Sequence, residues 1–232
     1  KRKVIEHAIS MGYKKVKIPD SLDIGESAQA TGTIAFLTTR KETFVDGYWM
    51  NVMQGVEEVA GDNRYDILFN FLRSQDIASL VLPKCIANRT IDGFVVAGNI
   101  GKEYNELLFN VKIPKVFIDI HSDMSFSDLK ADIVLMENEH SVYRITKHLI
   151  ELGHKEIGFI GDIENCRSFM ERWLGFKSAM EDANLEVLPQ FCAVRENPSS
   201  YQDYSDVVNA LANMEPLPTA FICANDLIAI QV

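Results

Sequence analysis

Segments with helical hydrophobic spacing alternate with short apolar runs along most of the chain. Between residues 139 and 152, apolar side chains recur at three- and four-residue steps, which predicts a helix with one apolar face. These side chains are Val142, Ile145, Leu149 and Leu152. Asn138 is the expected N-cap of this helix, and Gly153 is the expected left-handed residue that ends it. The apolar run at residues 156–160 is too short for a helix and is expected to be a buried strand. Residues 139–160 therefore predict a helix followed by a strand, which is one half of an α/β repeat.

The same alternation repeats in two halves of the chain. The first half contains expected strands at residues 33–38, 66–71, 93–97 and 116–120 and expected helices at residues 49–60, 75–88 and 103–109. The second half contains expected strands at residues 133–136, 156–160, 191–194 and 219–224 and expected helices at residues 139–152, from 168 onwards and at 203–213. This order predicts an α/β protein with two doubly wound parallel-sheet lobes, residues 32–120 and 132–232. Residues 121–131 are the expected crossover, and the second lobe is expected to be incomplete because the chain stops early in a further helix.

Two helices carry more detailed expectations. Ser168 and Glu171 have the spacing of a capping box, in which each side chain satisfies the other residue's free backbone N–H. The expected buried face of that helix consists of Phe169, Trp173, Phe176, Met180 and Ala183. The expected buried face of the helix at residues 49–60 consists of Val52, Met53, Val56 and Val59.

The net charge of −10 is unevenly distributed along the chain. Residues 1–17 carry a net charge of +5, which leaves −15 on the remainder. Residues 1–15 contain a short amphipathic helix pattern, whereas residues 16–31 gather Pro, Asp, Ser and Gly and predict a linker. Because the acidic remainder repels phosphate groups, we expect any contact with nucleic acid to come from the amino-terminal piece.

The four cysteines, Cys85, Cys166, Cys192 and Cys223, contain no close pair. Their spacing matches no zinc pattern, so no metal site is expected. Cys192 and Cys223 fall in expected strands, where a reduced thiol behaves as a small apolar side chain, and this indicates a reducing cytoplasmic compartment. No apolar run approaches the ~18 residues of a membrane helix, so no membrane association is expected.

Motifs for enzymatic chemistry fit the chain poorly. Gly158 and Gly161 follow the beginning of a dinucleotide fingerprint, but the third glycine and the later ribose-binding acid are not in place. Neither a phosphate-binding loop nor a nucleophile elbow is present. We therefore expect no enzyme, no catalytic residue and no cofactor.

Ligands of open parallel sheets bind beyond the carboxyl ends of the strands. The polar, charged and aromatic residues that follow the expected strands are Asp46, Tyr48, Trp49, Asn99, Asp119, Arg167, Arg172, Asn225 and Asp226. Aromatic faces cover the apolar side of a sugar ring and planar charged groups bridge neighbouring hydroxyls, so this set predicts a carbohydrate or nucleoside site. Its carboxylates outnumber its guanidiniums, which favours a neutral sugar or polyol over a sugar phosphate.

Each of these candidates also has a purely structural interpretation. Asp226 can cap the helix that begins there, and Asp119 can hold the crossover. Arg172 can be a surface residue, and one of Tyr48 and Trp49 can belong to the core. The ligand-binding set therefore depends on whether the fold brings these residues together.

Several segments resemble, in the family's order, the LacI/GalR family of bacterial transcription regulators. They are Ile91-Asp-Gly-Phe-Val95, Val134-Leu-Met-Glu-Asn138, the segment from His148 to His154, Arg172-Trp-Leu-Gly-Phe176 and the segment from Pro218 to Asp226. The segment Lys3–Tyr13 resembles the last helix of that family's DNA-binding head. The short hinge helix that the family carries between head and first lobe has no matching pattern in residues 14–31.

The resemblance implies two lobes like those of periplasmic binding proteins, a small-molecule effector in the cleft between them, operator DNA bound by the head, and a homodimer. The residues that match effector-contacting positions of the family are Tyr48, Trp49, Asp119, Arg172 and Asp226. The alternative is an exported sugar-binding protein of the same architecture. The basic helix at residues 3–13 favours the regulator, because an exported binding protein has no use for it.

Overall fold

Parallel strands form two separate sheets in the part of the chain that the computed structural model describes, residues 30–39, 47–195, 197 and 199–232. Both sheets belong to one compact unit, Thr31–Val232. The expected head remnant at residues 1–15 and nearly all of the expected linker at residues 16–31 lie outside the described residues. Within the described ranges, no helix is long and apolar enough to cross a membrane.

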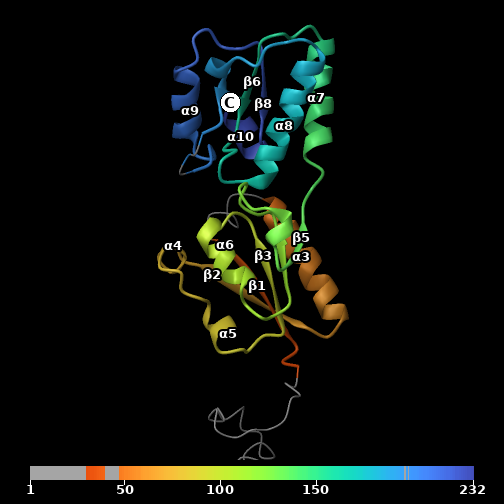
Figure 1. Cartoon of the computed structure of the whole chain (residues 1–232), viewed down its shortest axis with the longest axis vertical. Helices are drawn as coiled ribbons and strands as arrows, with labels where there is room; N and C mark the ends of the chain where they lie inside the picture. Colours follow the sequence, from red (N-terminus) through yellow and green to blue (C-terminus); the bar gives the residue numbers. More distant parts are fainter. Residues whose placement is uncertain (1–29, 40–46, 196, 198) are drawn as a thin grey trace, which may run out of the picture. The chain divides into compact units, whose positions relative to one another are not determined.

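The first sheet has five parallel strands in the order β2-β1-β3-β4-β5. The strands are β1 (Thr33–Thr39), β2 (Asp66–Leu72), β3 (Gly93–Ala97), β4 (Lys115–Ile118) and β5 (Asp132–Val134). The helices that follow them are α3 (Gly47–Asp62), α4 (Ser74–Ala78), α5 (Lys84–Ala87) and α6 (Lys102–Phe109). The strand at residues 132–134 was expected to open the second lobe, but it pairs with β4. Residues 121–131 therefore connect two strands of one sheet, and the chain passes to the second sheet through the segment after β5 (Figure 1).

The second sheet has three parallel strands in the order β7-β6-β8. The strands are β6 (Ile157–Ile160), β7 (Cys192–Ala193) and β8 (Ala220–Cys223), and the helices are α7 (Glu139–Glu151), α8 (Arg167–Asp182), α9 (Tyr204–Ala212) and α10 (Asp226–Gln231). Helices α7 and α8 lie on one side of this sheet and α9 lies on the other (Figure 1). The expected α/β fold with parallel sheets is confirmed.

Large aromatic side chains fill the core of each sheet. Phe94 and Phe117 are buried in the cluster between the first sheet and α6, and Phe36 packs with Met53 of α3. In the cluster between the second sheet and its helices, Phe159 of β6 and Phe176 of α8 are fully buried. Phe169 and Met180 are buried in the same cluster, as the periodicity of α8 predicts, and Trp173 packs against it.

Three details of the helices differ from the expectations. Residues 75–88 form two short helices, because Leu80 adopts a φ of 53° and Pro83, which lacks an amide hydrogen, precedes the second one. In α3, Val59 is 64% exposed. In α7, Val142 is buried as expected, but Ile145 is 55% exposed and the C-cap Leu152 is 64% exposed, and Thr146 is buried in their place. The apolar stripe of a helix can thus be wider than the face that its neighbours cover.

Candidate ligand-binding site

A cavity of about 490 Å³ lies where segments that follow the strands of both sheets approach one another. The first sheet contributes Tyr48 and Trp49 at the start of α3, Asn99 after β3 and Asp119 after β4. The second sheet contributes Phe169 and Arg172 from α8, Phe221 from β8, and Asn225 and Asp226 after β8. The structure therefore brings together Tyr48, Trp49, Asp119, Arg172 and Asp226 around one cavity, as the sequence predicts. Asp46 lies outside the described residues, and Arg167 does not line the cavity.

The two aromatic residues of α3 differ in burial. Tyr48 is 37% exposed, and its ring stands edge-on to the ring of Trp49, with a centroid distance of 5.0 Å. Trp49 is half-buried and also packs against the cluster that contains Phe36 and Met53. Trp49 thus serves both core and cavity wall, which agrees with the expectation that one of the pair belongs to the core.

Arg172 is half-buried in the cavity wall, and neighbouring groups fix its guanidinium. Its Nε donates to the side-chain oxygen of Asn138 at 3.0 Å, and its Nη1 donates to the backbone carbonyl of Ala224. Its charge also lies 5.7 Å from the ring centroid of Phe169. Arg172 is therefore not a free surface residue, and it presents an anchored positive charge at the cavity.

Asp119 lines the cavity, but its carboxylate is engaged by the protein itself. One oxygen accepts from the backbone N–H of Ile120 at 2.8 Å and of Ser168 at 3.3 Å. The other accepts from the Cys166 thiol at 3.3 Å. These contacts join the end of β4 to the start of α8, which is the structural interpretation that the sequence left open.

The expected capping box of α8 is wrong. The helix begins at Arg167 with Cys166 as its N-cap, and the Cys166 side chain accepts no hydrogen bond from a backbone N–H of the helix. Asp119 accepts the N–H of Ser168 instead, and Glu171 turns away to Arg167 and Asn138. A carboxylate from a distant strand has replaced the local partner.

The start of α10 decides between the two interpretations of Asp226. Asn225 is the N-cap, and its side-chain oxygen accepts the backbone N–H of Ile228 at 3.0 Å. Asp226 occupies the first turn of the helix and is exposed at the cavity, so capping is not its function. A carboxylate in the first turn of a helix is favoured by the helix dipole.

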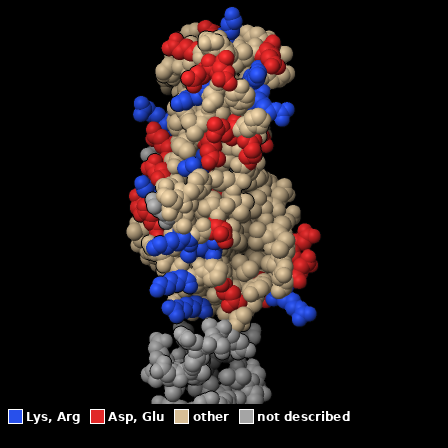
Figure 2. Space-filling view, turned by 45° about the vertical axis from the view of Figure 1, so that its right-hand side comes forward, with Lys and Arg blue, Asp and Glu red and all other residues tan. Residues whose placement is uncertain are grey.

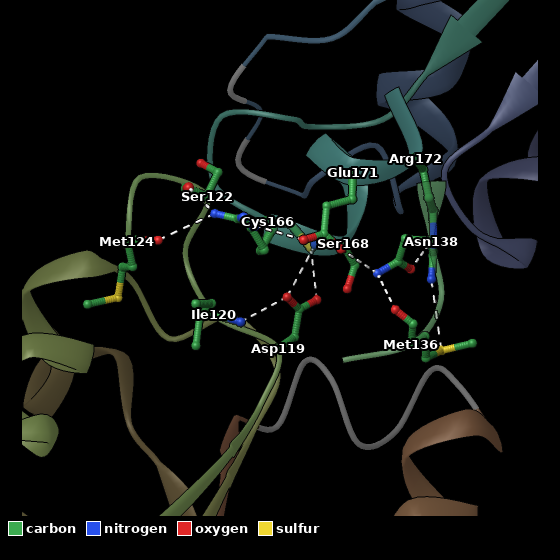
Figure 3. A network of polar contacts seen from close by, with 11 residues as sticks. Asp119, Ile120, Ser122, Met124, Met136, Asn138, Cys166, Ser168, Glu171 and Arg172 are labelled. Atoms are coloured by element: carbon green, nitrogen blue, oxygen red, sulfur yellow. Dashed lines mark hydrogen bonds and ion pairs between the residues drawn. The ribbon is translucent and has the colours of Figure 1, made fainter. Parts of the chain in front are cut away.

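Helix α7 is capped by a residue that precedes its N-cap. The Glu137 carboxylate accepts the backbone N–H groups of His140 and Ser141 at 2.6 and 2.8 Å. The hydrogen bond from the Ser141 hydroxyl, together with these N–H groups, lowers the pKa of Glu137. Asn138 occupies the expected N-cap position, but its side chain does not cap the helix. Asn138 is buried and contacts Met136, Glu171 and Arg172 (Figure 3).

The described residues around the cavity carry more negative than positive charge. Asp119, Glu137 and Asp226 are its carboxylates, and Arg172 is the one cation among the described lining residues. Across the described ranges, no group of three or more His, Cys, Asp or Glu side chains is placed to hold a metal ion. The electrostatics of the described wall therefore disfavour a multiply charged anion.

Sequence reasoning missed one residue that holds two loops of the second sheet together. Asp162, fully buried after β6, accepts the backbone N–H groups of Glu164 and Asn165 at 3.1 Å and of Asn197 at 3.3 Å. It thereby ties the loop before α8 to the loop before α9. Its place directly after a strand and Gly161 was the signal that could have identified it.

Comparison with known proteins identifies related chains. A family model described as a periplasmic binding protein-like domain matches residues 146–232. The HTH-type transcriptional repressor PurR of Haemophilus influenzae (strain PittEE) is 27% identical over 228 residues, which cover 97% of this chain and 65% of that protein. The chain thus spans about two thirds of the length of such relatives.

Solved structures agree on the fold. A regulatory protein of the LacI family from Chloroflexus aggregans superimposes with a TM-score of 0.69 at 21% identity, covering 87% of this chain and 71% of that one. The transcriptional regulator CelR in complex with cellobiose gives a TM-score of 0.71 at 17% identity, covering 99% of this chain and 66% of that one. In sequence and fold, the chain is similar to transcription regulators of the LacI/GalR family. In this chain, the cavity is lined by residues that follow strands of both sheets.

Proposed function

We propose that this chain is the effector-binding region of a cytoplasmic transcription regulator of the LacI/GalR family. The observation that carries the proposal is the cavity of about 490 Å³, which is lined from both sheets by aromatic side chains, carboxylates and one anchored guanidinium. A ligand that contacts both sheets favours one arrangement of them over another, which is how an effector shifts a conformational equilibrium. The PurR relatives, which are described as repressors, support this proposal over an exported sugar-binding protein.

The proposed effector is a neutral sugar. The described wall holds three carboxylates, of which Asp226 is exposed, and one guanidinium. Hydroxyl groups therefore find an acceptor and a donor there, whereas a phosphate dianion finds too little positive charge. The CelR complex with cellobiose is a structural neighbour that binds a sugar, although its 17% identity shows the fold alone. A purine base is the second candidate, because the curated relatives are PurR repressors and a planar base can stack on Tyr48 or Trp49.

Titration calorimetry on the full-length protein tests these candidates. The panel consists of glucose, ribose, cellobiose, the phosphates of the two monosaccharides, adenine and guanine. The sugar proposal expects the tightest binding from an unphosphorylated sugar. Tighter binding of a sugar phosphate contradicts the charge argument, and tighter binding of a base selects the second candidate.

Operator DNA is the proposed macromolecular partner, bound through the amino-terminal head. Outside residues 1–17 the chain carries a net charge of −15, which opposes the approach of phosphate groups. We therefore expect residues 1–232 alone to have no specific affinity for DNA. A gel-shift assay at physiological salt with the operator of the full-length protein tests this expectation, and specific binding by residues 1–232 contradicts it.

A homodimer is proposed to form at the free edge of the first sheet. Strand β2 is the edge strand there, and Leu68 and Phe69 are each 40% exposed. Met50 and Val59 on α3 are 45% and 64% exposed. The part of Figure 2 that holds the first sheet shows a broad area with few charged side chains. Large exposed apolar areas on a folded protein mark interaction sites.

A further inference from the structure

Asn138 is held in one orientation by the groups around its side chain. The residue is 3% exposed, and its amide nitrogen donates to the Met136 carbonyl and to a Glu171 oxygen, each at 3.0 Å. Both of these neighbours are acceptors only, so the amide nitrogen must face them. The amide oxygen is then directed to the Nε of Arg172, which donates to it at 3.0 Å (Figure 3).

Glu171 extends this contact away from the cavity. One of its oxygens accepts from Asn138, and the other accepts from the Nε of Arg167 at 2.9 Å. The side chains of Arg167 and Glu171 are only 19% and 18% exposed, so water screens this ion pair weakly.

Arg167 contacts the segment between β4 and β5. Its Nη1 lies 3.5 Å from the Ser122 carbonyl oxygen and 3.4 Å from that of Met124. Its guanidinium also lies 4.5 Å from the ring centroid of Phe126. A continuous series of polar contacts thus runs from the cavity wall at Arg172 through Asn138, Glu171 and Arg167 to this segment.

We propose that Asn138 and Glu171 are positioning residues that hold the Arg172 guanidinium at the cavity and connect its orientation to Arg167. The proposal rests on the proposed function in that Arg172 is positioned for a ligand. An arginine fixed before binding loses less side-chain freedom when the ligand arrives, which corresponds to roughly two- to tenfold in affinity. The same contacts make Arg167 sensitive to whatever moves Arg172.

Arginine side-chain NMR on the ligand-free full-length protein tests the positioning without any knowledge of the ligand. The Nε–H signals of Arg167 and Arg172 are assigned from Arg167→Lys and Arg172→Lys. In Asn138→Ala, we expect the Arg172 Nε–H to exchange with water roughly tenfold faster or more, because a hydrogen bond to a charged group is lost. The Arg167 signal is expected to shift as well, because Glu171 loses one of its two donors.

Two further variants make this experiment decisive. Glu171→Gln keeps the shape of the side chain and is expected to shift both arginine signals, which guards against a fold defect specific to Asn138→Ala. Asn213→Ala replaces an exposed asparagine at the end of α9 and is expected to leave both signals unchanged. An unchanged Arg172 signal in Asn138→Ala overturns the positioning role, and an unchanged Arg167 signal overturns the connection.

Calorimetry with cellobiose and adenine separates positioning from mere stabilisation. Asn138→Ala is expected to weaken the binding of whichever probe binds by two- to tenfold, and to cause no further loss in an Arg172→Ala background. An equal loss in both backgrounds means that Asn138 acts without Arg172, which overturns the proposal. If neither probe binds the wild-type protein, the proposed ligand classes fail, while the NMR result still decides the positioning role.

Discussion

The Asp119 carboxylate links two elements through backbone atoms that are far apart in the sequence. It accepts hydrogen bonds from the backbone N–H groups of Ile120 and Ser168 and from the thiol of Cys166. Its own backbone adopts a φ of 67°, a conformation that costs most residues energy and that Asp and Asn tolerate better than others. The hydrogen bonds and the positive φ each explain an aspartate at position 119 without any contact to a ligand.

Replacement of Asp119 is therefore expected to destabilise the fold. Asp119→Ala removes the acceptor and places a less tolerant residue in the left-handed region, so we expect the free energy of unfolding to fall by about 2–3 kcal/mol. Asp119→Asn retains a side-chain oxygen and the backbone preference, and its loss should be smaller. Urea unfolding of the two variants measures the difference, and equal losses would argue against this account.

Arg172 is expected to affect binding far more than folding. Its guanidinium contacts the Asn138 side chain and the Ala224 carbonyl at the cavity wall. Arg172→Ala should fold and should lose effector affinity worth on the order of 2–4 kcal/mol, because a charge-assisted contact in a shielded site is removed. Circular dichroism checks the fold and calorimetry the affinity. Lys177→Ala, at an exposed position of the same helix, serves as control, and near wild-type affinity of Arg172→Ala means that the site is assigned wrongly.

At the scale of elements, helices α7 and α8 meet at a glycine. A Cβ atom built on Gly175 of α8 would overlap the carbonyl oxygen of Glu139 and lie 2.9 Å from its carbonyl carbon. Both atoms belong to the backbone at the start of α7, which cannot move aside as a flexible side chain can. The close approach of the two helices therefore depends on the absence of a side chain at this position.

Substitution of that glycine is expected to separate the helices. Gly175→Ala should lower the free energy of unfolding by about 2–4 kcal/mol, since overpacking against backbone forces the elements apart. Gly55→Ala on α3 is the matched control, because a Cβ there meets nothing within 4 Å. Replacing a glycine within a helix by alanine favours the helix by roughly 0.5–1 kcal/mol, so the control should be slightly more stable. Thermal unfolding of both variants measures the contrast.

Helices and strands could be predicted from the sequence where a single hydrophobic period dominated a segment. Strands β1, β3 and β6 lie close to their expected positions, and Gly153 ends α7 with a φ of 99° as expected. Strand β5 was located correctly but assigned to the wrong sheet, because periodicity says which segment is a strand and not which neighbour it pairs with.

The residues of the cavity could be predicted from the sequence, but their polar contacts could not. The residues of the cavity could be found because each follows a strand, and parallel strands bring their carboxyl ends to one edge. Their partners could not, because Asp119 and Ser168 are 49 residues apart in the sequence, and Asn138 and Arg172 are 34 apart. Local rules such as the capping box consider only neighbours within one helical turn. Here the Asp119 side chain, which is distant in the sequence, accepts the Ser168 N–H instead of such a neighbour.

At the scale of the whole molecule, exposed apolar residues on α3 and β2 predict self-association. Val59→Glu introduces a carboxylate on the proposed dimer face, where burial of an unpaired charge costs several kcal/mol. We expect the wild-type protein to be a dimer at micromolar concentration and the variant a monomer, as measured by light scattering after size-exclusion chromatography. Leu217→Glu, at a 55% exposed position before β8, should remain dimeric. A dimeric Val59→Glu variant places the interface elsewhere.

The two tryptophans of the chain, Trp49 and Trp173, also give the molecule an intrinsic optical reporter. Trp49 stands in the cavity wall, whereas Trp173 packs edge-on to Phe159 in the core of the second sheet, with ring centroids 5.2 Å apart. Excitation at the indole absorption band therefore samples one emitter in the cavity wall and one outside the lining of the cavity. In Trp173→Phe the remaining emission comes from Trp49 alone, so its wavelength and its quenching by a soluble quencher follow occupancy of the cavity without any attached dye.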